Sequence, residues 1–415
     1  MATPQTRHDY QMEDREGAPS PQARRVGEAH TVSRGQSPQP PEGALEELRN
    51  HEPMLNARKA KCRKQVTART VLPRENRINF CCMRGLFSNG ENFHPEVHLT
   101  AAGVATLHKT ARCAQVWVCP ICSAQISARR AAELQGAVDQ WVEDGGDVVL
   151  LTLTHHHDRN DDLADLMAAQ ADATQGFWRQ GSLRRTLNLA GLVGRVSGLE
   201  VTYGLKTGWH PHRHVVMFID RLSEEDKCRF AKRLKKYWQN ACERAGLKAS
   251  YEHGADVRFG HQAAGKYTAK FGLEVTLNHA KNQKGDRFSP WALLDYIDET
   301  GEAWAVDRFR EYAQVMKGRR QLSWSRGLKE RFGVDEVSDE DACGEQEEST
   351  STPVLVLPGD TLMRLRTSKL GDLLPELLML VEKKDYRGVE GLVRVVRGGV
   401  GWLDGHGPPL PHAAP

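Results

Sequence analysis

The sequence lacks the features that would assign the chain to a membrane, a secreted or a strongly charged class. Its apolar runs fall short of the ~20 residues that a membrane-spanning helix needs. Its first residues, MATPQTRHDYQMEDRE, are charged and contain no apolar core of a secretory signal. The formal net charge of +3 is too small to indicate a nucleic-acid partner by itself. We therefore expect a cytoplasmic protein with no membrane partner.

Large apolar residues are also scarce at the start of the chain. The first 55 residues are rich in Pro, Gly, Ser, Gln and charged side chains. A segment with so little apolar surface cannot bury enough of it to offset the entropy of ordering. Residues 1–55 are therefore predicted to be a disordered tail, and the rest of the 415 residues is long enough for two or three domains.

The cysteines do not form the even set that a disulfide framework requires. There are nine, and their clustering is typical of metal ligands in a reducing compartment. Cys119 and Cys122 form a CxxC knuckle, and Cys113 adds a third thiol nearby. Zinc takes four N or S ligands in a tetrahedron, so we predict a structural zinc site with Cys82 as the fourth ligand. The alternatives for that fourth position are Cys81, His94, His98 and His108.

Buried free thiols and a redox CxxC pair are the other interpretations of this cluster. A redox pair normally opens a helix beside a βαβ unit, whereas a basic helix carrying Arg129 and Arg130 follows here. Residues 56–130 contain 13 lysines and arginines but only 3 acidic residues. Such a segregated basic region is typical of proteins that contact a phosphate backbone, so the module and these two arginines are predicted to touch DNA.

The stretch 208–220, GWHPHRHVVMFID, predicts a strand with two functional faces. Because side chains alternate along a strand, His212 and His214 point one way and the residues Val215, Met217 and Ile219 the other. Two imidazoles on a strand supply half of a metal site, and a basic, exposed strand edge is the alternative.

Glu200 lies on the preceding predicted strand, across a predicted hairpin from the histidines. A carboxylate beside two imidazoles suits Mg²⁺ or Mn²⁺, so Glu200 is a candidate third ligand. The alternative for Glu200 is an ordinary solvent-facing strand residue.

The order of predicted elements indicates an α+β fold. Strands and helices alternate as β–α–β–β–α–β–α over the segments 147–154, 162–180, 196–203, 208–219, 223–245, 255–259 and 261–271. This order matches the split βαβ, ferredoxin-like plan, an antiparallel sheet with helices. The histidine strand is then central, and the last helix lies across its metal-facing side. On that helix Tyr267 and Lys270 are neighbours at positions i and i+3.

Three motifs in this order resemble those of the HUH endonucleases. They are the TLT strand end at 152–154, GWHPHRH at 208–214 and KYTAK at 266–270. The chain is most similar to the single-tyrosine initiators of rolling-circle plasmid replication, the Rep proteins, from about Arg112 to about Gly327. The zinc module would precede the HUH nuclease core.

The resemblance implies an enzyme that nicks one DNA strand at a single-stranded or hairpin replication origin. Tyr267 would become joined to the 5′-phosphate and leave a 3′-OH primer. Lys270 matches the lysine of the motif, and His212 and His214 match the metal ligands. Host helicase and polymerase are the partners that such an initiator implies.

The sequence departs from the family pattern at two positions. The residue between the two histidines is usually bulky and apolar and is Arg213 here. Related initiators carry a glutamate four residues before the tyrosine, where this chain has Ala263. The second departure bears on how the reaction ends.

The chain stays basic after the tyrosine helix and then changes character. Arg319, Arg320 and Arg326 are interleaved with tryptophans, which suits DNA contact, although packing and a solvated face explain the same pattern. We predict a cysteine-rich zinc module with its helix at 56–146 and an endonuclease domain with a basic extension at 147–334. An acidic linker at 335–353 and a small helical module at 354–415 follow.

Three other functions are alternatives to a replication initiator on the sequence alone. Another HUH enzyme, such as a transposase or a mobilisation relaxase, would share the motifs. A DNA-binding regulator with a zinc module would share the basic cysteine-rich region without catalysis. A metal hydrolase of small molecules would leave that basic region without a use.

Overall fold

The computed structural model describes residues 51–88, 90–268, 286–344 and 351–398. Residues 51–398 belong to one compact unit that begins at Asn50. Helix α2 (His51–Val71) starts inside the segment predicted to be a tail, so the folded region begins slightly earlier than the sequence indicated. No helix among the described residues is long and apolar enough to cross a membrane.

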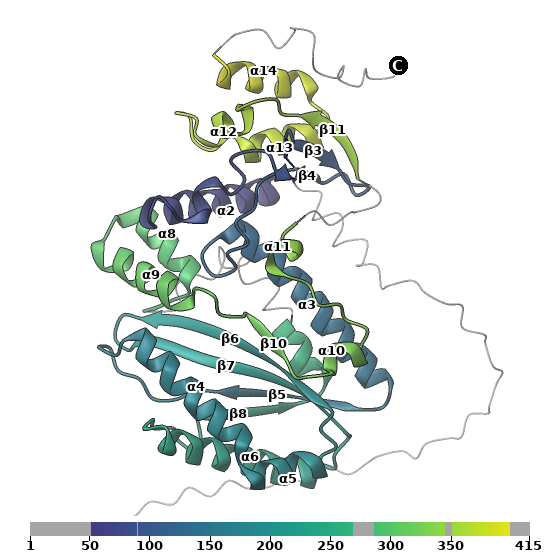
Figure 1. Cartoon of the computed structure of the whole chain (residues 1–415), viewed down its shortest axis with the longest axis vertical. Helices are drawn as coiled ribbons and strands as arrows, with labels where there is room; N and C mark the ends of the chain where they lie inside the picture. Colours follow the sequence, from purple (N-terminus) through teal and green to yellow (C-terminus); the bar gives the residue numbers. More distant parts are fainter. Residues whose placement is uncertain (1–50, 89, 269–285, 345–350, 399–415) are drawn as a thin grey trace, which may run out of the picture. The chain divides into compact units, whose positions relative to one another are not determined.

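The core of the fold is an antiparallel sheet with the strand order β10-β6-β7-β5-β8 (Figure 1). Its strands are β5 (Asp147–Leu153), β6 (Gly194–Gly204), β7 (Gly208–Ile219), β8 (Ala255–Phe259) and β10 (Leu322–Trp324), with β9 (Arg287–Phe288) paired to the end of β6. Each β–α–β unit of the core has another strand inserted between its two strands, as in the split βαβ plan. The α+β class and the central place of the histidine strand β7 agree with the prediction.

One face of this sheet is covered by α4 (Leu163–Arg179), α5 (Gly181–Leu189) and α6 (Glu224–Arg244) (Figure 1). Helix α6 starts where the sequence indicated, because the Ser223 side chain accepts a hydrogen bond from the backbone N–H of Asp226. The core on this side joins Phe177, Leu234 and Trp238 of the helices to Val215, Met217 and Ile219 of β7. The prediction that these β7 residues face a core is thus confirmed.

The other face of the sheet carries α3 (Pro120–Glu143), the helical segment 261–268 and α10 (Leu328–Arg331). Leu134, Val138 and Trp141 of α3 pack against Val216 and Phe218 of β7. The indole of Trp141 also donates hydrogen bonds to backbone carbonyls on two strands of the sheet, 3.1 and 2.9 Å away. Helix α3 is therefore fixed on the same side of β7 as the histidines.

The cysteine-rich region and the C-terminal part of the chain share one sheet. It contains α2, the 3₁₀ helix η1 (Arg77–Phe80), β1 (Phe87–Ser88), β2 (Glu91–Asn92), β3 (Glu96–Leu99) and β4 (Ala105–His108). The C-terminal elements are β11 (Thr352–Val356), α12 (Thr361–Arg366), α13 (Leu374–Glu382) and α14 (Tyr386–Val396). Strand β11 completes a sheet of order β11-β3-β4, so the predicted helical module is built partly on strands from the other end of the chain.

Two further helices, α8 (Pro290–Thr300) and α9 (Ala303–Met316), pack between α2 and the β6 end of the sheet. Part of the predicted acidic linker is also folded. Ser338 caps the short helix α11 (Asp339–Ala342), and Ala342 and Cys343 are buried beside the cysteine-rich core. The segment 335–344 is therefore docked onto the protein, which its acidic composition did not indicate.

Candidate active site and metal centre

Glu200, His212 and His214 come together on the hairpin formed by β6 and β7. Glu200 lies directly opposite His212 in the strand register. Its Oε2 atom is 3.2 Å from Nε2 of His212 and 3.0 Å from Nε2 of His214. One ligand atom from each of the three residues lies within 4.8 Å of the others, and all three side chains are half-buried. This geometry lets the three residues converge on one divalent cation.

The second nitrogen of each imidazole is held by a neighbouring group. His214 Nδ1 lies 3.0 Å from the hydroxyl of Thr152, which pairs with it across β5 and β7. His212 Nδ1 lies 3.4 Å from the backbone carbonyl of His210. Such outer contacts orient imidazole ligands and fix their tautomer. Both rings are thus set with Nε2 directed at Glu200, a donor set that fits a cation preferring oxygen and imidazole.

The third histidine of the strand, His210, lies outside this group of three. Its Nδ1 is 2.6 Å from Nε2 of His157, whose Nδ1 is 2.7 Å from the carbonyl of Thr207. Burial, followed by the neighbouring imidazole of His212, lowers the pKa of His210 to about 3. His210 is therefore neutral near pH 7 and adds no positive charge beside the candidate cation site.

Tyr267 is buried against the same group of side chains. Its ring centroid is 4.8 Å from that of His214, and the residue is only 7% exposed. The hydroxyl lies over Gly198, the residue that pairs with His214 across the hairpin, and a methyl group there would collide with it. The sequence-predicted residues Tyr267, His214 and Glu200 therefore share one small pocket, with a volume of about 30 Å³. Lys270 lies outside the described residues.

The helical segment that carries Tyr267 is attached to α3 by polar contacts that the sequence analysis missed. Asp139 Oδ1 is 2.6 Å from Nε2 of His261, and the side chain of Gln135 donates to the same carboxylate at 2.7 Å. Gln135 also accepts a hydrogen bond from the hydroxyl of Thr268. The sequence could have indicated these contacts, because Gln135 and Asp139 are four residues apart and therefore share one face of the helix.

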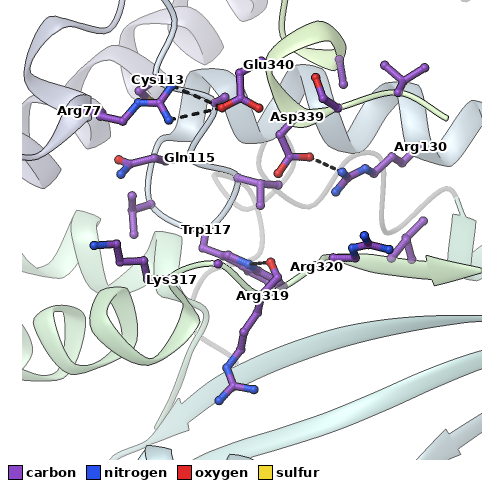
Figure 2. Close-up of a pocket in the computed structure, with 18 of the residues that line it drawn as sticks. Arg77, Cys113, Gln115, Trp117, Arg130, Lys317, Arg319, Arg320, Asp339 and Glu340 are labelled. Atoms are coloured by element: carbon purple, nitrogen blue, oxygen red, sulfur yellow. Dashed lines mark hydrogen bonds and ion pairs between the residues drawn. The ribbon is translucent and has the colours of Figure 1, made fainter.

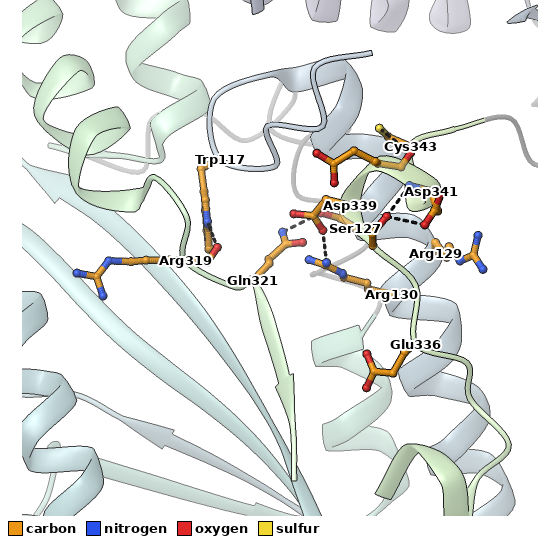
Figure 3. Close-up of polar contacts among 12 residues, drawn as sticks. Trp117, Ser127, Arg129, Arg130, Arg319, Gln321, Glu336, Asp339, Asp341 and Cys343 are labelled. Atoms are coloured by element: carbon orange, nitrogen blue, oxygen red, sulfur yellow. Dashed lines mark hydrogen bonds and ion pairs between the residues drawn. The ribbon is translucent and has the colours of Figure 1, made fainter. Parts of the chain in front are cut away.

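The pocket around Tyr267 also contains polar residues that no motif indicated. Ser123 and Ser127 of α3 line it, together with Gln321 just before β10. The Gln321 side chain donates to the hydroxyl of Ser127 at 2.8 Å (Figure 3). These residues come from segments far apart in sequence, so only the fold brings them together.

Four buried cysteines form a second candidate metal centre, the four-cysteine cluster. They are Cys81, Cys113, Cys119 and Cys122. The sulfur of Cys81 is 3.7 Å from that of Cys119 and 3.5 Å from that of Cys122, and Cys113 is 3.7 Å from Cys122. Four converging buried thiols match the donor set of structural zinc, so the cluster could hold a metal such as zinc.

The fourth member of the cluster is Cys81, which the sequence offered as an alternative to Cys82. Cys82 follows with a φ of 55°, and its sulfur, 3.8 Å from that of Cys81, accepts a hydrogen bond from the Arg112 guanidinium at 2.6 Å. None of the histidine alternatives belongs to the cluster among the described residues, and the rings of His98 and His108 stack on each other on β3 and β4, with centroids 3.9 Å apart. Hydrogen bonds with Cys113, Cys119 and Cys122 hold the pKa of Cys81 well below its usual range.

The predicted DNA-contacting arginines divide into two groups. Arg130, Arg319 and Arg320 line one groove with a volume of about 850 Å³ (Figure 2). Arg129 instead pairs with Glu133 on α3, 3.2 Å away, and Arg326 is exposed outside the groove.

A family model and one of two curated relatives indicate a replication protein. A family model described as a replication protein matches residues 104–356, which include Tyr267, His212 and His214. "Protein rep" of Streptomyces lividans is 28% identical over 306 residues, covering 57% of this chain and 67% of that protein. "Neomycin resistance protein" of Streptomyces cyanogenus is 36% identical over 149 residues, covering 30% of this chain and 34% of that protein. The chain thus spans about two thirds of the first relative and one third of the second. No solved structure gives a significant match.

Proposed function

Because the chain belongs to the Rep family of replication proteins, a family of plasmid replication initiators, we propose that it nicks and rejoins one DNA strand at a replication origin. The observation that carries the proposal is the position of Tyr267. Its phenol lies beside His214, one of three residues that converge on a candidate cation site. A buried tyrosine next to such a site suits nucleophilic attack on phosphorus.

The Tyr267 oxygen forms a bond to the scissile phosphorus, and the bond from phosphorus to the 3′-oxygen of the preceding nucleotide breaks. The products are a 5′-phosphotyrosine and a free 3′-OH strand, and the phenol proton leaves to solvent or to a nearby base. Because one phosphodiester replaces another, a 3′-OH can later attack the adduct and restore the DNA strand. Lys270 is the proposed ammonium that favours the phenolate, since a free phenol has a pKa of about 10.

Glu200, His212 and His214 are the proposed ligands of a catalytic Mg²⁺ or Mn²⁺. Such a cation, when bound, polarises the scissile phosphate and offsets the negative charge that develops on it. Thr152 holds His214 in the orientation that this role requires, 3.0 Å from its Nδ1. The strand order of the central sheet supports the proposal that this is the HUH nuclease core, with β7 as its histidine strand.

The four-cysteine cluster is the proposed structural zinc site, and the basic surface beside it is the proposed DNA-binding region. Gln65 places its amide 3.3 Å from the sulfur of Cys119, and the backbone carbonyl of Cys81 accepts a hydrogen bond from Arg69. These contacts join the cluster to α2, so metal binding would stabilise the whole N-terminal half. Arg129, Arg130, Arg319, Arg320 and Arg326 are the proposed contacts to the phosphate backbone.

The test uses labelled single-stranded oligonucleotides tiled across the DNA that flanks the gene. With Mg²⁺ or Mn²⁺, an initiator converts one oligonucleotide into a denaturation-resistant protein adduct and a shorter strand ending in a 3′-OH. A non-catalytic regulator binds DNA but yields no adduct. A transposase or relaxase would also form a tyrosyl adduct, so the sequence around the nick distinguishes a transposon end or a transfer origin from a replication origin.

A further inference from the structure

The large groove lies between the cysteine-rich region and the segment that enters β10 (Figure 2). Lys317, Arg319 and Arg320 line one side of it. Within the parts of the chain that the structure describes, none of these three cations forms an ion pair with a carboxylate. The Arg319 guanidinium points away from Asp339 and Glu340 (Figure 2), so Lys317 and Arg320 are the two cations that favour a negatively charged ligand in this groove of about 850 Å³.

Two tryptophans give the groove a second property. Trp117 and Trp324 both line it and are both partly exposed. The indole N–H of Trp117 donates to the carbonyl of Arg319 at 2.7 Å, which fixes the ring at the edge of the basic segment. Indole rings beside cations suit the stacking of unpaired bases along a phosphate backbone. An acidic peptide or a duplex would use the charges and leave the indole faces unused.

The groove is adjacent to the pocket of Tyr267. Val116 and Trp117 line both cavities. Gln321 follows Arg320 of the groove directly in sequence and lines the pocket. There its side chain donates a hydrogen bond to the hydroxyl of Ser127 on α3. A single strand lying in the groove would therefore lead to the proposed nucleophile.

Three carboxylates lie on the opposite wall of the same groove, each paired with a cation that also lines it. Asp339 pairs with Arg130, Glu340 lies 3.3 Å from Arg77, and Glu336 lies 3.3 Å from Lys329 (Figures 2 and 3). These carboxylates belong to the docked segment 335–344. Asp339 and Glu340 lie across the groove from Lys317 and Arg320 (Figure 2), where a bound strand would bring its phosphates. Phosphates and carboxylates repel each other, so the strand and the docked segment compete for one site.

Two buried side chains, Ala342 and Cys343, and three ion pairs hold this segment. Asp339 pairs with Arg130 and Glu336 with Lys329, and the pair of Arg77 and Glu340 is more than half exposed. Exposed ion pairs contribute ~0–1 kcal/mol and weaken with salt. A polyanion that gains several new contacts can therefore displace the segment.

We propose that this groove binds the single-stranded DNA next to the scissile phosphate, and that the acidic segment 335–344 occupies it in the free protein in place of DNA. The strand displaces the segment when it binds. This inference rests on the proposed function, because it assigns the substrate path and the regulation of the same Tyr267 site.

The first test compares two triple variants of the full chain. Glu336→Gln, Asp339→Asn and Glu340→Gln remove the acidic wall. Glu224→Gln, Glu225→Gln and Glu252→Gln make the same change in net charge at exposed positions elsewhere. Affinity for a fluorescent oligothymidine strand is measured by anisotropy at several salt concentrations. We expect the wall variant to bind roughly tenfold more tightly at low salt and the control to stay within about twofold of the native protein.

The second test follows the segment itself by hydrogen exchange. In the free protein the amides of Ala342 and Cys343 bond to the carbonyls of Ser338 and Asp339, at 2.9 and 3.1 Å. Saturating oligothymidine should speed their exchange. Equal affinity gains in both triple variants, or unchanged exchange at saturation, would overturn the inference. Tighter binding of an acidic peptide than of the oligonucleotide would also overturn it.

Adduct formation is measured in the same samples and keeps the two proposals separate. If the native protein forms the tyrosyl adduct while affinity and exchange fail to respond, the groove inference alone is wrong. If no adduct forms with any DNA while the wall variant binds more tightly and the segment is displaced, the groove is supported and the nicking proposal fails.

Discussion

The hydroxyl group of Tyr267 occupies the space over Gly198 where a side chain at residue 198 would begin. Gly198 pairs with His214 across the hairpin of β6 and β7. The missing side chain therefore allows the phenol to lie against the imidazole, with ring centroids 4.8 Å apart. Gly198 thus acts as a positioning residue that sets the distance between Tyr267 and the candidate cation site.

Gly198→Ala should slow adduct formation by displacing the Tyr267 hydroxyl. The added methyl group also approaches the Leu322 side chain to 3.1 Å, so the site has little room to relax. Overpacking of this kind costs about 1–3 kcal/mol. We expect adduct formation to fall at least tenfold, while affinity for single-stranded DNA and metal content stay unchanged. Gly176→Ala on α4, where a methyl group meets no atom within 4 Å, is the control and should form the adduct normally.

His212→Ala combined with His214→Ala should abolish binding of the catalytic cation without unfolding the protein. Both imidazoles are directed at Glu200 and not into an apolar core. The measurement is the rise in melting temperature on adding Mn²⁺, which the native protein should show and the double variant should lose together with adduct formation. His253→Ala, at an exposed position, serves as the control. Metal-dependent cleavage by the double variant would place the cation elsewhere.

Cys81→Ser and Cys82→Ser separate the two adjacent thiols. Cys81 lies within the four-cysteine cluster, whereas Cys82 accepts a hydrogen bond from Arg112. Because a structural metal contributes directly to folding, Cys81→Ser should lose bound zinc and melt at a lower temperature. Cys82→Ser should keep its zinc. Elemental analysis decides between them, and zinc loss in Cys82→Ser alone, or no zinc in the native protein, would contradict the assignment.

Ala263→Glu should open a hydrolytic route for the adduct. Residues four apart on a helix share a face, so a carboxylate at residue 263 would lie near Tyr267. A general base acting on water accelerates such a step by roughly 10²–10⁴-fold. We expect the native adduct to persist until a 3′-OH strand is added, and the Ala263→Glu adduct to decay in water. Ala263→Gln has nearly the same shape without a base, and its adduct should persist as well. Rapid decay of the native adduct without an acceptor strand would indicate a base elsewhere in the protein.

The sequence was sufficient to predict strands β5, β6, β7 and β8 of the central sheet, because the information for them is local, whereas β9 and β10 were not predicted. Alternation along β7 separates His212 and His214 from Val215, Met217 and Ile219, and the short turn before Gly208 fixes a hairpin that brings Glu200 opposite His212. The capping serine of α6 marked the start of that helix. Each of these features depends on residues close together in the chain.

The features that the sequence did not indicate depend on contacts between distant segments. Cys81 and Cys82 are chemically identical neighbours, and only the turn around them decides which sulfur meets the CxxC knuckle. Strand β11 pairs with β3 from the other end of the chain, a pairing that periodicity cannot show. The acidic composition of 335–344 indicated a linker. Composition alone cannot show that the segment packs beside Arg77 and Arg130, which lie far from it in sequence.

Identification of the residue that carries the DNA adduct tests the central claim most directly. The full chain is incubated with its origin oligonucleotide and Mn²⁺, digested with protease and nuclease, and analysed by mass spectrometry. We expect a nucleotide 5′-phosphate on the peptide that contains Tyr267. Tyr267→Phe should yield no adduct while binding the oligonucleotide as tightly as the native protein, and the exposed-site control Tyr251→Phe should form the adduct normally. An adduct on another residue, or an undiminished adduct in Tyr267→Phe, would contradict the assignment of Tyr267 as the nucleophile.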